Sequence, residues 1–170
     1  MNLKQIIAAI SVLALLIILI YPALATGTVS IMLRSSKIAN ADHVYITVND
    51  VWVHGARQGS GQGWELLSNT SRRFDLMSLV NSSEMMKGAA PVGSYDSVRF
   101  DISNATWLFN GTTNNMQLES GQLVSNIDFT CRASGEQVLT VVVNARTETL
   151  QGQRYLAATL NATLSNASSY

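Results

Sequence analysis

The sequence predicts an all-β protein: an antiparallel β-sandwich of about seven to nine strands, preceded by one N-terminal hydrophobic helix. Three observations predict this class. From Gly27 onward apolar residues alternate with polar ones at a period of two, and turn residues separate these runs about every 8 to 12 positions. A long apolar run, Ile6 to Ile20, stands at the N-terminus, with Ser11 as its only polar residue. With 170 residues the chain has room for one domain of ordinary size.

The N-terminal segment is typical of an export signal. Lys4 precedes the apolar run, Pro22 breaks it, and Ala23-Leu24-Ala25 places small residues where signal peptidase requires them. Cleavage after Ala25 is one interpretation, and a retained membrane anchor over residues 6–25 is the other. We therefore divide the chain into a signal peptide or anchor (1–25), a β-sandwich domain (26–160) and a polar C-terminal tail (161–170), with everything after the segment outside the cell.

The first half of the domain contains the clearest strands. Every second residue is apolar over 28–34, which predicts the first strand. The next strand runs from Val44 to Val53, and its apolar parity changes at Asn49-Asp50, which predicts a β-bulge. A glycine-rich loop over 55–63 leads into a further strand at 64–67.

In the second half the pattern is less regular at first. Residues 74–80 form an irregular apolar cluster, and a short helix is expected around Ser83 to Lys87. Asn110-Gly111 predicts a tight hairpin, because both residues tolerate positive φ. The remaining strands are expected at 95–102, 105–109, 115–118, near 123, 127–132, 138–143 and 155–160, with residues 145–150 as an extension of the strand at 138–143.

Composition excludes one class of partner. Lys plus Arg and Asp plus Glu stand at 11 each, so the formal net charge is zero, and charged residues make up only 13% of the chain. A nucleic-acid-binding protein needs an excess of positive charge. We expect no nucleic-acid partner and a surface made mostly of neutral polar side chains.

Six N-x-[ST] acceptors support an exported, glycosylated chain. The candidate asparagines are Asn69, Asn81, Asn104, Asn110, Asn161 and Asn166. The alternative is that asparagine and serine are simply common in turns. The single cysteine, Cys131, shares the parity of Ile127 and Phe129, so we expect a buried thiol in the core.

The order of these features resembles a known family. The segments GTVSIML, VYITVNDVWVH, GWELL, FDLMSL, PVGSYDSVRFDISNATW, VLTVVVNA and GQRYLAATL are similar to exported prokaryotic proteins catalogued as domain of unknown function 4382, over about residues 27–160. The resemblance implies an immunoglobulin-like or transthyretin-like sandwich and carries over no catalytic residue. Lipoprotein members have a cysteine at the cleavage site, where this chain has Ala25-Thr26, so no lipid anchor is expected.

The residues offer little catalytic chemistry. His43 and His54 lie at opposite ends of one expected strand, too far apart to share a metal ion. No G-x-S-x-G, P-loop or paired-carboxylate pattern occurs. Asp75 and Arg99 are expected to form a structural ion pair. We therefore expect no catalytic residues, no metal site and no cofactor, and a protein that is not an enzyme.

Two binding functions remain. Exposed aromatic residues, Trp52, Trp64 and Trp107, would offer a stacking platform for sugar rings, although strand aromatics more often fill a core. The first strand offers the other function. With Val29, Ile31 and Leu33 on one face it would follow directly on a cleaved signal, free to pair into the sheet of another copy. The alternative is that it closes an edge of its own sandwich.

We therefore expect an extracellular structural or adhesive protein, as a glycosylated filament subunit that assembles through residues 28–34. A secreted carbohydrate-binding module is the second expectation. The partners are then other copies of the chain or a carbohydrate, and a membrane only if residues 6–25 are retained.

Overall fold

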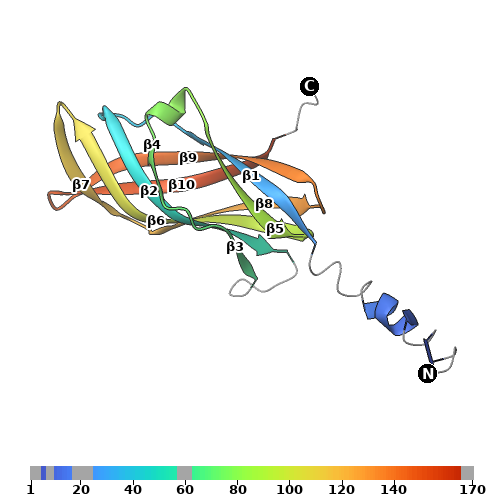
Figure 1. Cartoon of the computed structure of the whole chain (residues 1–170). Coiled ribbons are helices and arrows are strands. Elements are labelled where there is room, and N and C mark those ends of the chain that lie inside the picture. Colours follow the sequence, from blue (N-terminus) through green and yellow to red (C-terminus); the bar gives the residue numbers. More distant parts are fainter. Residues whose placement is uncertain (1–4, 7–9, 17–24, 57–62, 166–170) are drawn as a thin grey trace.

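The computed structural model describes residues 5–6, 10–16, 25–56 and 63–165, and this part of the chain is mostly β (Figure 1). Residues 5–6 and 10–16 are helical, and no helix among the described residues is long and apolar enough to cross a membrane. The expectations for residues 1–4, 7–9 and 17–24 lie outside the described residues. The strands are β1 (Thr26–Ser35), β2 (His43–Gly55), β3 (Trp64–Ser68), β4 (Arg72–Asp75), β5 (Glu84–Pro91), β6 (Gly93–Phe109), β7 (Thr112–Leu118), β8 (Gln122–Cys131), β9 (Glu136–Leu150) and β10 (Gln153–Leu164), with one 3-10 turn, η1 (Ser78–Val80).

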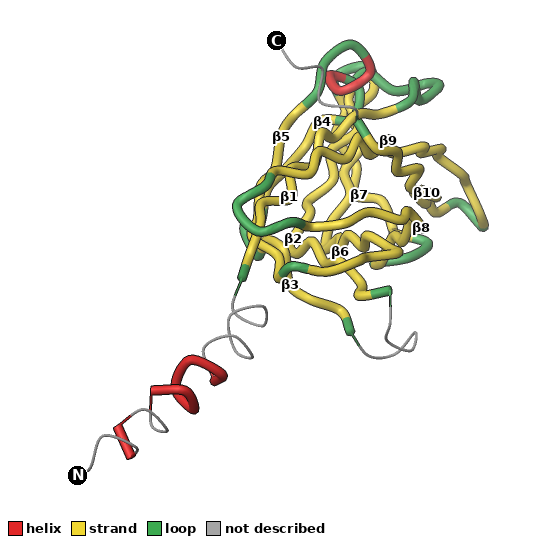
Figure 2. The backbone as a smooth tube through the Cα atoms, turned by 90° about the vertical axis from the view of Figure 1, so that its right-hand side faces the viewer, coloured by secondary structure: helices red, strands yellow, loops and turns green. Residues whose placement is uncertain are grey.

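The described strands form one mixed sheet that curls into a nearly closed barrel (Figure 2). Their order is β3-β2-β6-β7-β10-β9-β1-β5, with β4 paired to β2 and β8 to β6. β7 pairs antiparallel with β6 and parallel with β10, so it joins the two halves that a sandwich would keep separate. The expected sandwich is corrected to this extent: the chain is mostly β, as predicted, but its described strands form one continuous sheet and not two separate layers.

The barrel nearly closes where β5 passes β3. A methyl group at Gly88 of β5 would overlap the carbonyl oxygen of Leu67 in β3, so the two backbones approach closely there. Glycine is the residue that permits this approach. The core inside the ring is apolar, and its largest wholly buried side chains include Phe74, Phe100 and Ile31.

Local patterns predicted several elements correctly. The register of β2 against β6 shifts between Val48 and Asp50, which confirms the expected bulge. Asn110 and Gly111 have φ of +48° and +74° and connect β6 to β7, which confirms the hairpin. β10 continues to Leu164, into the segment expected as a polar tail.

The helix expected around residues 83–87 is wrong. This segment belongs to β5, which pairs antiparallel with β1 along its whole length. Met86 and Ala90 of β5 are buried, since the alternate side chains of the strand face the core. Glu, Met and Lys are good helix formers, but this preference is weak and the long ladder with β1 outweighs it.

Candidate functional site

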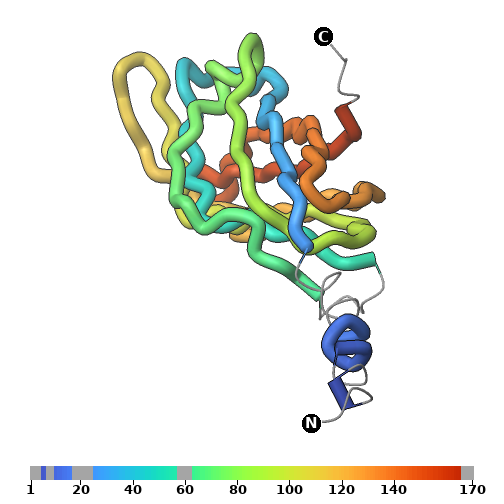
Figure 3. Tube along the Cα trace, turned by 45° about the vertical axis from the view of Figure 1, so that its right-hand side comes forward, coloured from blue at the N-terminus to red at the C-terminus, as the bar shows by residue number. Residues whose placement is uncertain are grey.

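The first strand lies inside the sheet, not at an edge. β1 pairs antiparallel with β5 and parallel with β9. Figure 3 shows β1, in blue, running between the light green β5 and the orange β9. Val29, Ile31 and Leu33 are each 0% exposed and contribute to the centre of the core. The groove between β5 and β9 is therefore filled, on both edges and on its inner side, by one N-terminal strand.

Polar side chains hold the outer side of this strand. The Ser30 hydroxyl donates a hydrogen bond to Glu136 Oε1 at 2.5 Å, and Lys87 Nζ lies 2.9 Å from the same oxygen. These residues come from β1, β9 and β5. The hydrogen bonds from Lys87 and then Ser30 hold the pKa of Glu136 below its usual value. One carboxylate thus bridges all three strands.

The start of β1 is closely packed. A side chain at Gly27 would overlap the carbonyl oxygen of Arg132 and crowd the Cys131 sulfur. The carbonyl oxygen of Thr26 accepts from the Ser134 amide at 3.2 Å, and the Thr28 amide donates to the Gly135 carbonyl at 2.9 Å. Only glycine fits the second position of the strand without a shift of the β8–β9 connection.

Cys131 lies where the sequence predicts it, in the core. The residue is 1% exposed, and burial raises the pKa of its thiol. Its sulfur lies 3.4 Å from the Ala90 carbonyl oxygen of β5. The thiol therefore belongs to the floor of the groove beneath the start of β1.

Two of the three candidate tryptophans lie together. Trp52 and Trp64 are half-buried, and the Arg99 guanidinium lies 5.1 Å and 4.7 Å from their ring centroids. Asp101 accepts a hydrogen bond from Trp52 Nε1 at 2.8 Å and pairs with Arg99 Nε at 3.0 Å. Leu66 is exposed beside Trp52, its partner in the ladder. Arginine thus fills the space between the two rings.

Trp107 lies elsewhere. It is 5% exposed, its Nε1 donates to the Asn40 carbonyl at 3.0 Å, and the Arg154 guanidinium covers its ring at 3.7 Å from the centroid. Phe109 stacks on it at 5.4 Å. This ring fills the core in the described structure and offers no open face for a ligand.

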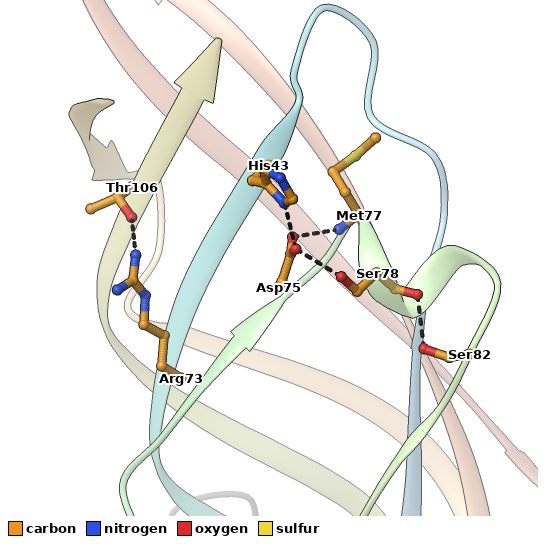
Figure 4. A network of polar contacts seen from close by, with 7 residues as sticks. All are labelled: His43, Arg73, Asp75, Met77, Ser78, Ser82 and Thr106. Atoms are coloured by element: carbon orange, nitrogen blue, oxygen red, sulfur yellow. Dashed lines mark hydrogen bonds and ion pairs between the residues drawn. The ribbon is translucent and has the colours of Figure 1, made fainter. Parts of the chain in front are cut away.

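Asp75 is the centre of a polar network at the start of β2 (Figure 4). It pairs with His43 Nδ1 at 2.6 Å and accepts hydrogen bonds from the Ser78 hydroxyl at 2.8 Å and the Met77 amide at 3.0 Å. Burial alone would raise the pKa of Asp75, but the hydrogen bonds from these three residues outweigh it, so the pKa lies below its usual value. The expected Asp75–Arg99 ion pair is wrong, because Arg99 pairs with Asp101.

The order of these groups does not match a hydrolytic triad. In a triad the histidine lies between the carboxylate and the nucleophile, so that it can take the proton of the hydroxyl. Here the carboxylate of Asp75 lies between His43 and Ser78, and both groups bind to it. The network is suited to holding η1 against the start of β2. Among the described residues no group of three His, Cys, Asp or Glu side chains could hold a metal ion.

The glycosylation candidates within the described residues all lie at the surface. Asn69, Asn81, Asn104, Asn110 and Asn161 are exposed, and Asn166 lies outside the described residues. They belong to connections or to β6 and β10. None of these five described acceptors stands on β1, β5 or β9, so the described strands of the groove carry no candidate glycan.

Comparison with protein families matches residues 26–157 to the domain of unknown function DUF4382. The chain belongs to this family. The match begins at the first residue of β1, so this strand is part of the DUF4382 domain and not a linker before it. No curated protein and no solved structure matches the chain.

Within this DUF4382 domain, sequence reasoning located the apolar face of β1 and missed its polar contacts. Ser30 has the parity of an outward-facing residue, yet it is 0% exposed. Its partners, Lys87 and Glu136, are distant in sequence, and no local pattern connects them with it. A small hydroxyl residue between two β-branched or apolar ones is a weak signal for such a buried outer position.

Proposed function

We propose that this chain is a non-enzymatic extracellular structural subunit that assembles with other copies by donating its first strand, residues 28–34. One observation carries the proposal: an N-terminal strand fills a two-sided groove between β5 and β9, with three wholly buried apolar side chains. Its nearest covalent connection to the rest of the domain is the segment from Ser36 to Asp42. The immunoglobulin-like or transthyretin-like subclass expected above stays a prediction.

Strand donation needs no new contact. Every partner of β1 in the ladder stands on β5 or β9, far along the chain, so the same groove on a second copy would offer the same partners. Exchange of an identical element is a low-cost route to association. When each copy gives its strand to the next, the contact is head-to-tail, and it produces a fibre where the rotation between copies does not close into a ring.

The surface composition supports an extracellular location. Charged residues are few, and the exposed candidate asparagines avoid all three strands of the groove. Glycans at these positions would coat a fibre and leave the docking strands uncovered. Export through the N-terminal segment is part of the same proposal.

A mixed disulfide tests strand donation. Thr28 of β1 is opposite Ala89 of β5 in the antiparallel ladder. In a Cys131→Ala background, one full-length chain carries Thr28→Cys and a second, with a different tag, carries Ala89→Cys. After the two are refolded together and oxidised, we expect a covalent dimer of unlike chains, because directly opposed strand residues lie within about 4.5 to 5.5 Å at Cβ.

A matched control separates donation from random contact. Thr28→Cys mixed with Asn115→Cys places the second thiol at an exposed position of β7, away from the groove. We expect little mixed dimer from this pair. If the Ala89 pair forms no more covalent dimer than the Asn115 pair, strand donation is wrong.

Carbohydrate binding remains a second candidate on one observation, the half-buried Trp52 and Trp64 beside exposed Leu66. Arg99 already lies between the two rings, which leaves less ring surface for a sugar. A glycan array tests this candidate. Binding that is lost in Trp52→Ala and retained in Trp107→Phe would support it, and an array without any binding would remove it.

A further inference from the structure

We propose that the groove between β5 and β9 recognises its strand by a residue code: glycine at position 27, apolar side chains at 29, 31 and 33, and a small hydroxyl at 30. The occupant that fits this code is the first strand of a second copy of the chain. The inference deepens the proposed function and rests on it, since it names what the groove selects.

The apolar positions by themselves do not set the register. Side chains alternate along a strand with a period of two, so a slip of two residues keeps every apolar side chain on the inner face. Position 27 removes this freedom. A two-residue slip in either direction would bring Val29 or Ala25 to the place of Gly27, where a side chain overlaps the Arg132 carbonyl oxygen.

Position 30 distinguishes the observed register from slipped ones on the outer face of the strand. In the observed register the Ser30 hydroxyl reaches Glu136, which Lys87 also binds. A slip of two residues would bring Met32 or Thr28 to this wholly buried position. Met32 has no hydrogen-bond donor, and threonine adds a methyl group where serine is already 0% exposed. Serine therefore matches the site in both size and hydrogen bonding.

The two parts of the code lie on different partners in an exchanged pair. The donor would bring Gly27 and Ser30, and the acceptor would bring Lys87, Glu136 and the Arg132 carbonyl. Charge is balanced on the acceptor by the Lys87–Glu136 pair, so the incoming strand needs a neutral donor at position 30. Selection of the chain's own strand over other apolar strands follows from these contacts.

The test uses full-length Gly27→Val as the acceptor, since its own first strand should dock badly. The acceptor is refolded from urea with a fluorescent peptide of residues 26–35, and capture is measured by gel filtration. We expect capture of the wild-type peptide and about tenfold weaker capture of peptides carrying Gly27→Val or Ser30→Val, because each loses the fit or a buried hydrogen bond. A peptide of the same composition in scrambled order is the control.

A second acceptor covers the case in which Gly27→Val does not refold. In full-length Ser30→Val the chain's own first strand should also dock weakly, so this acceptor should capture the wild-type peptide. A double change tests the Ser30 contact directly: an acceptor that also carries Glu136→Leu should no longer distinguish the wild-type peptide from the Ser30→Val peptide. A purely structural role of Glu136 would lower the capture of both peptides equally and keep the difference between them.

The outcomes separate this inference from the proposed function. Capture in the expected order without a mixed disulfide between full-length chains supports the code and overturns strand donation between chains. A mixed disulfide together with equal capture of all peptides, the scrambled one included, overturns the code and leaves donation intact. Failure of both acceptors to capture the wild-type peptide also overturns the code.

Discussion

The carbonyl oxygen of Ala25 accepts a hydrogen bond from the Val92 amide at 2.9 Å. The peptide bond between Ala25 and Thr26, where we expect signal peptidase to cut, therefore directly adjoins the ladder of β1 with β5. Signal peptidase needs its substrate as an accessible extended strand. If signal peptidase cuts at this bond, docking of β1 and cleavage would compete for the same backbone.

This relationship predicts that the folded precursor resists processing. Full-length protein refolded before exposure to signal peptidase should keep the mass of the intact chain, 18.4 kDa, whereas the same protein added in unfolded form should lose residues 1–25. Intact mass spectrometry measures both. Gly27→Val serves as the matched variant, because it disturbs docking and leaves the Ala-Leu-Ala motif unchanged, so it should be cut in both states. Equal cleavage of folded and unfolded wild-type chains would contradict the prediction.

Removal of one groove-filling side chain should destabilise the whole domain. Ile31 is 0% exposed at the centre of β1, and we expect Ile31→Ala to lower the free energy of unfolding by about 2 to 5 kcal/mol, through lost burial and the cavity left behind. Urea unfolding followed by tryptophan fluorescence gives this value. Leu150→Ala is the control, since Leu150 is 57% exposed and its loss should change stability by less than about 0.5 kcal/mol. Similar values for the two variants would show that β1 does not fill the core.

The Asp75 network predicts a pH dependence of stability. The folded-state pKa of Asp75 lies below its ordinary value of 3.8, so the ionised carboxylate stabilises the native state. This contribution is complete above the ordinary value and is lost as the pH falls through the folded value. At pH 6 we expect Asp75→Asn to cost about 1 to 3 kcal/mol, and the difference from wild type to shrink as the pH falls below the ordinary value of 3.8.

Urea midpoints measured at pH 6, 4 and 3 test this dependence. Asp128→Asn is the matched control, because Asp128 is exposed and none of the contacts described above involves it. A difference between Asp75→Asn and wild type that stays constant from pH 6 to pH 3 would mean that ionised Asp75 contributes nothing to stability.

The single thiol should report on the opening of the groove. Cys131 is 1% exposed and burial raises its pKa, so both access and thiolate formation are unfavourable in the native state. At pH 8 we expect a thiol reagent to label the native protein about 100-fold or more slowly than the unfolded one. Faster labelling in Gly27→Val would connect the exposure of Cys131 with the undocking of β1. Rapid labelling of the native wild-type chain would show that the thiol is accessible.

Local patterns predicted those features that depend on neighbouring residues. The parity change at Asn49-Asp50 predicted the bulge, and the glycine after Asn110 predicted the hairpin. The helix predicted around residues 83–87 was wrong, because the helix-forming composition of this segment is a local signal, whereas its pairing with β1 is a contact between distant residues. The predicted Asp75–Arg99 ion pair was wrong for the same reason, since no local pattern indicates which carboxylate an arginine pairs with.

By itself the sequence determined that this protein is mostly β, that Val29, Ile31 and Leu33 share a buried face, and that Cys131 points inward. Only the tertiary structure decided which strands flank β1 and that Ser30, Lys87 and Glu136 meet over it. The physical reason is the range of the interactions. Apolar residues that recur at every second position show which side of a strand is buried. The choice of neighbouring strands depends instead on how distant segments pair when the barrel forms.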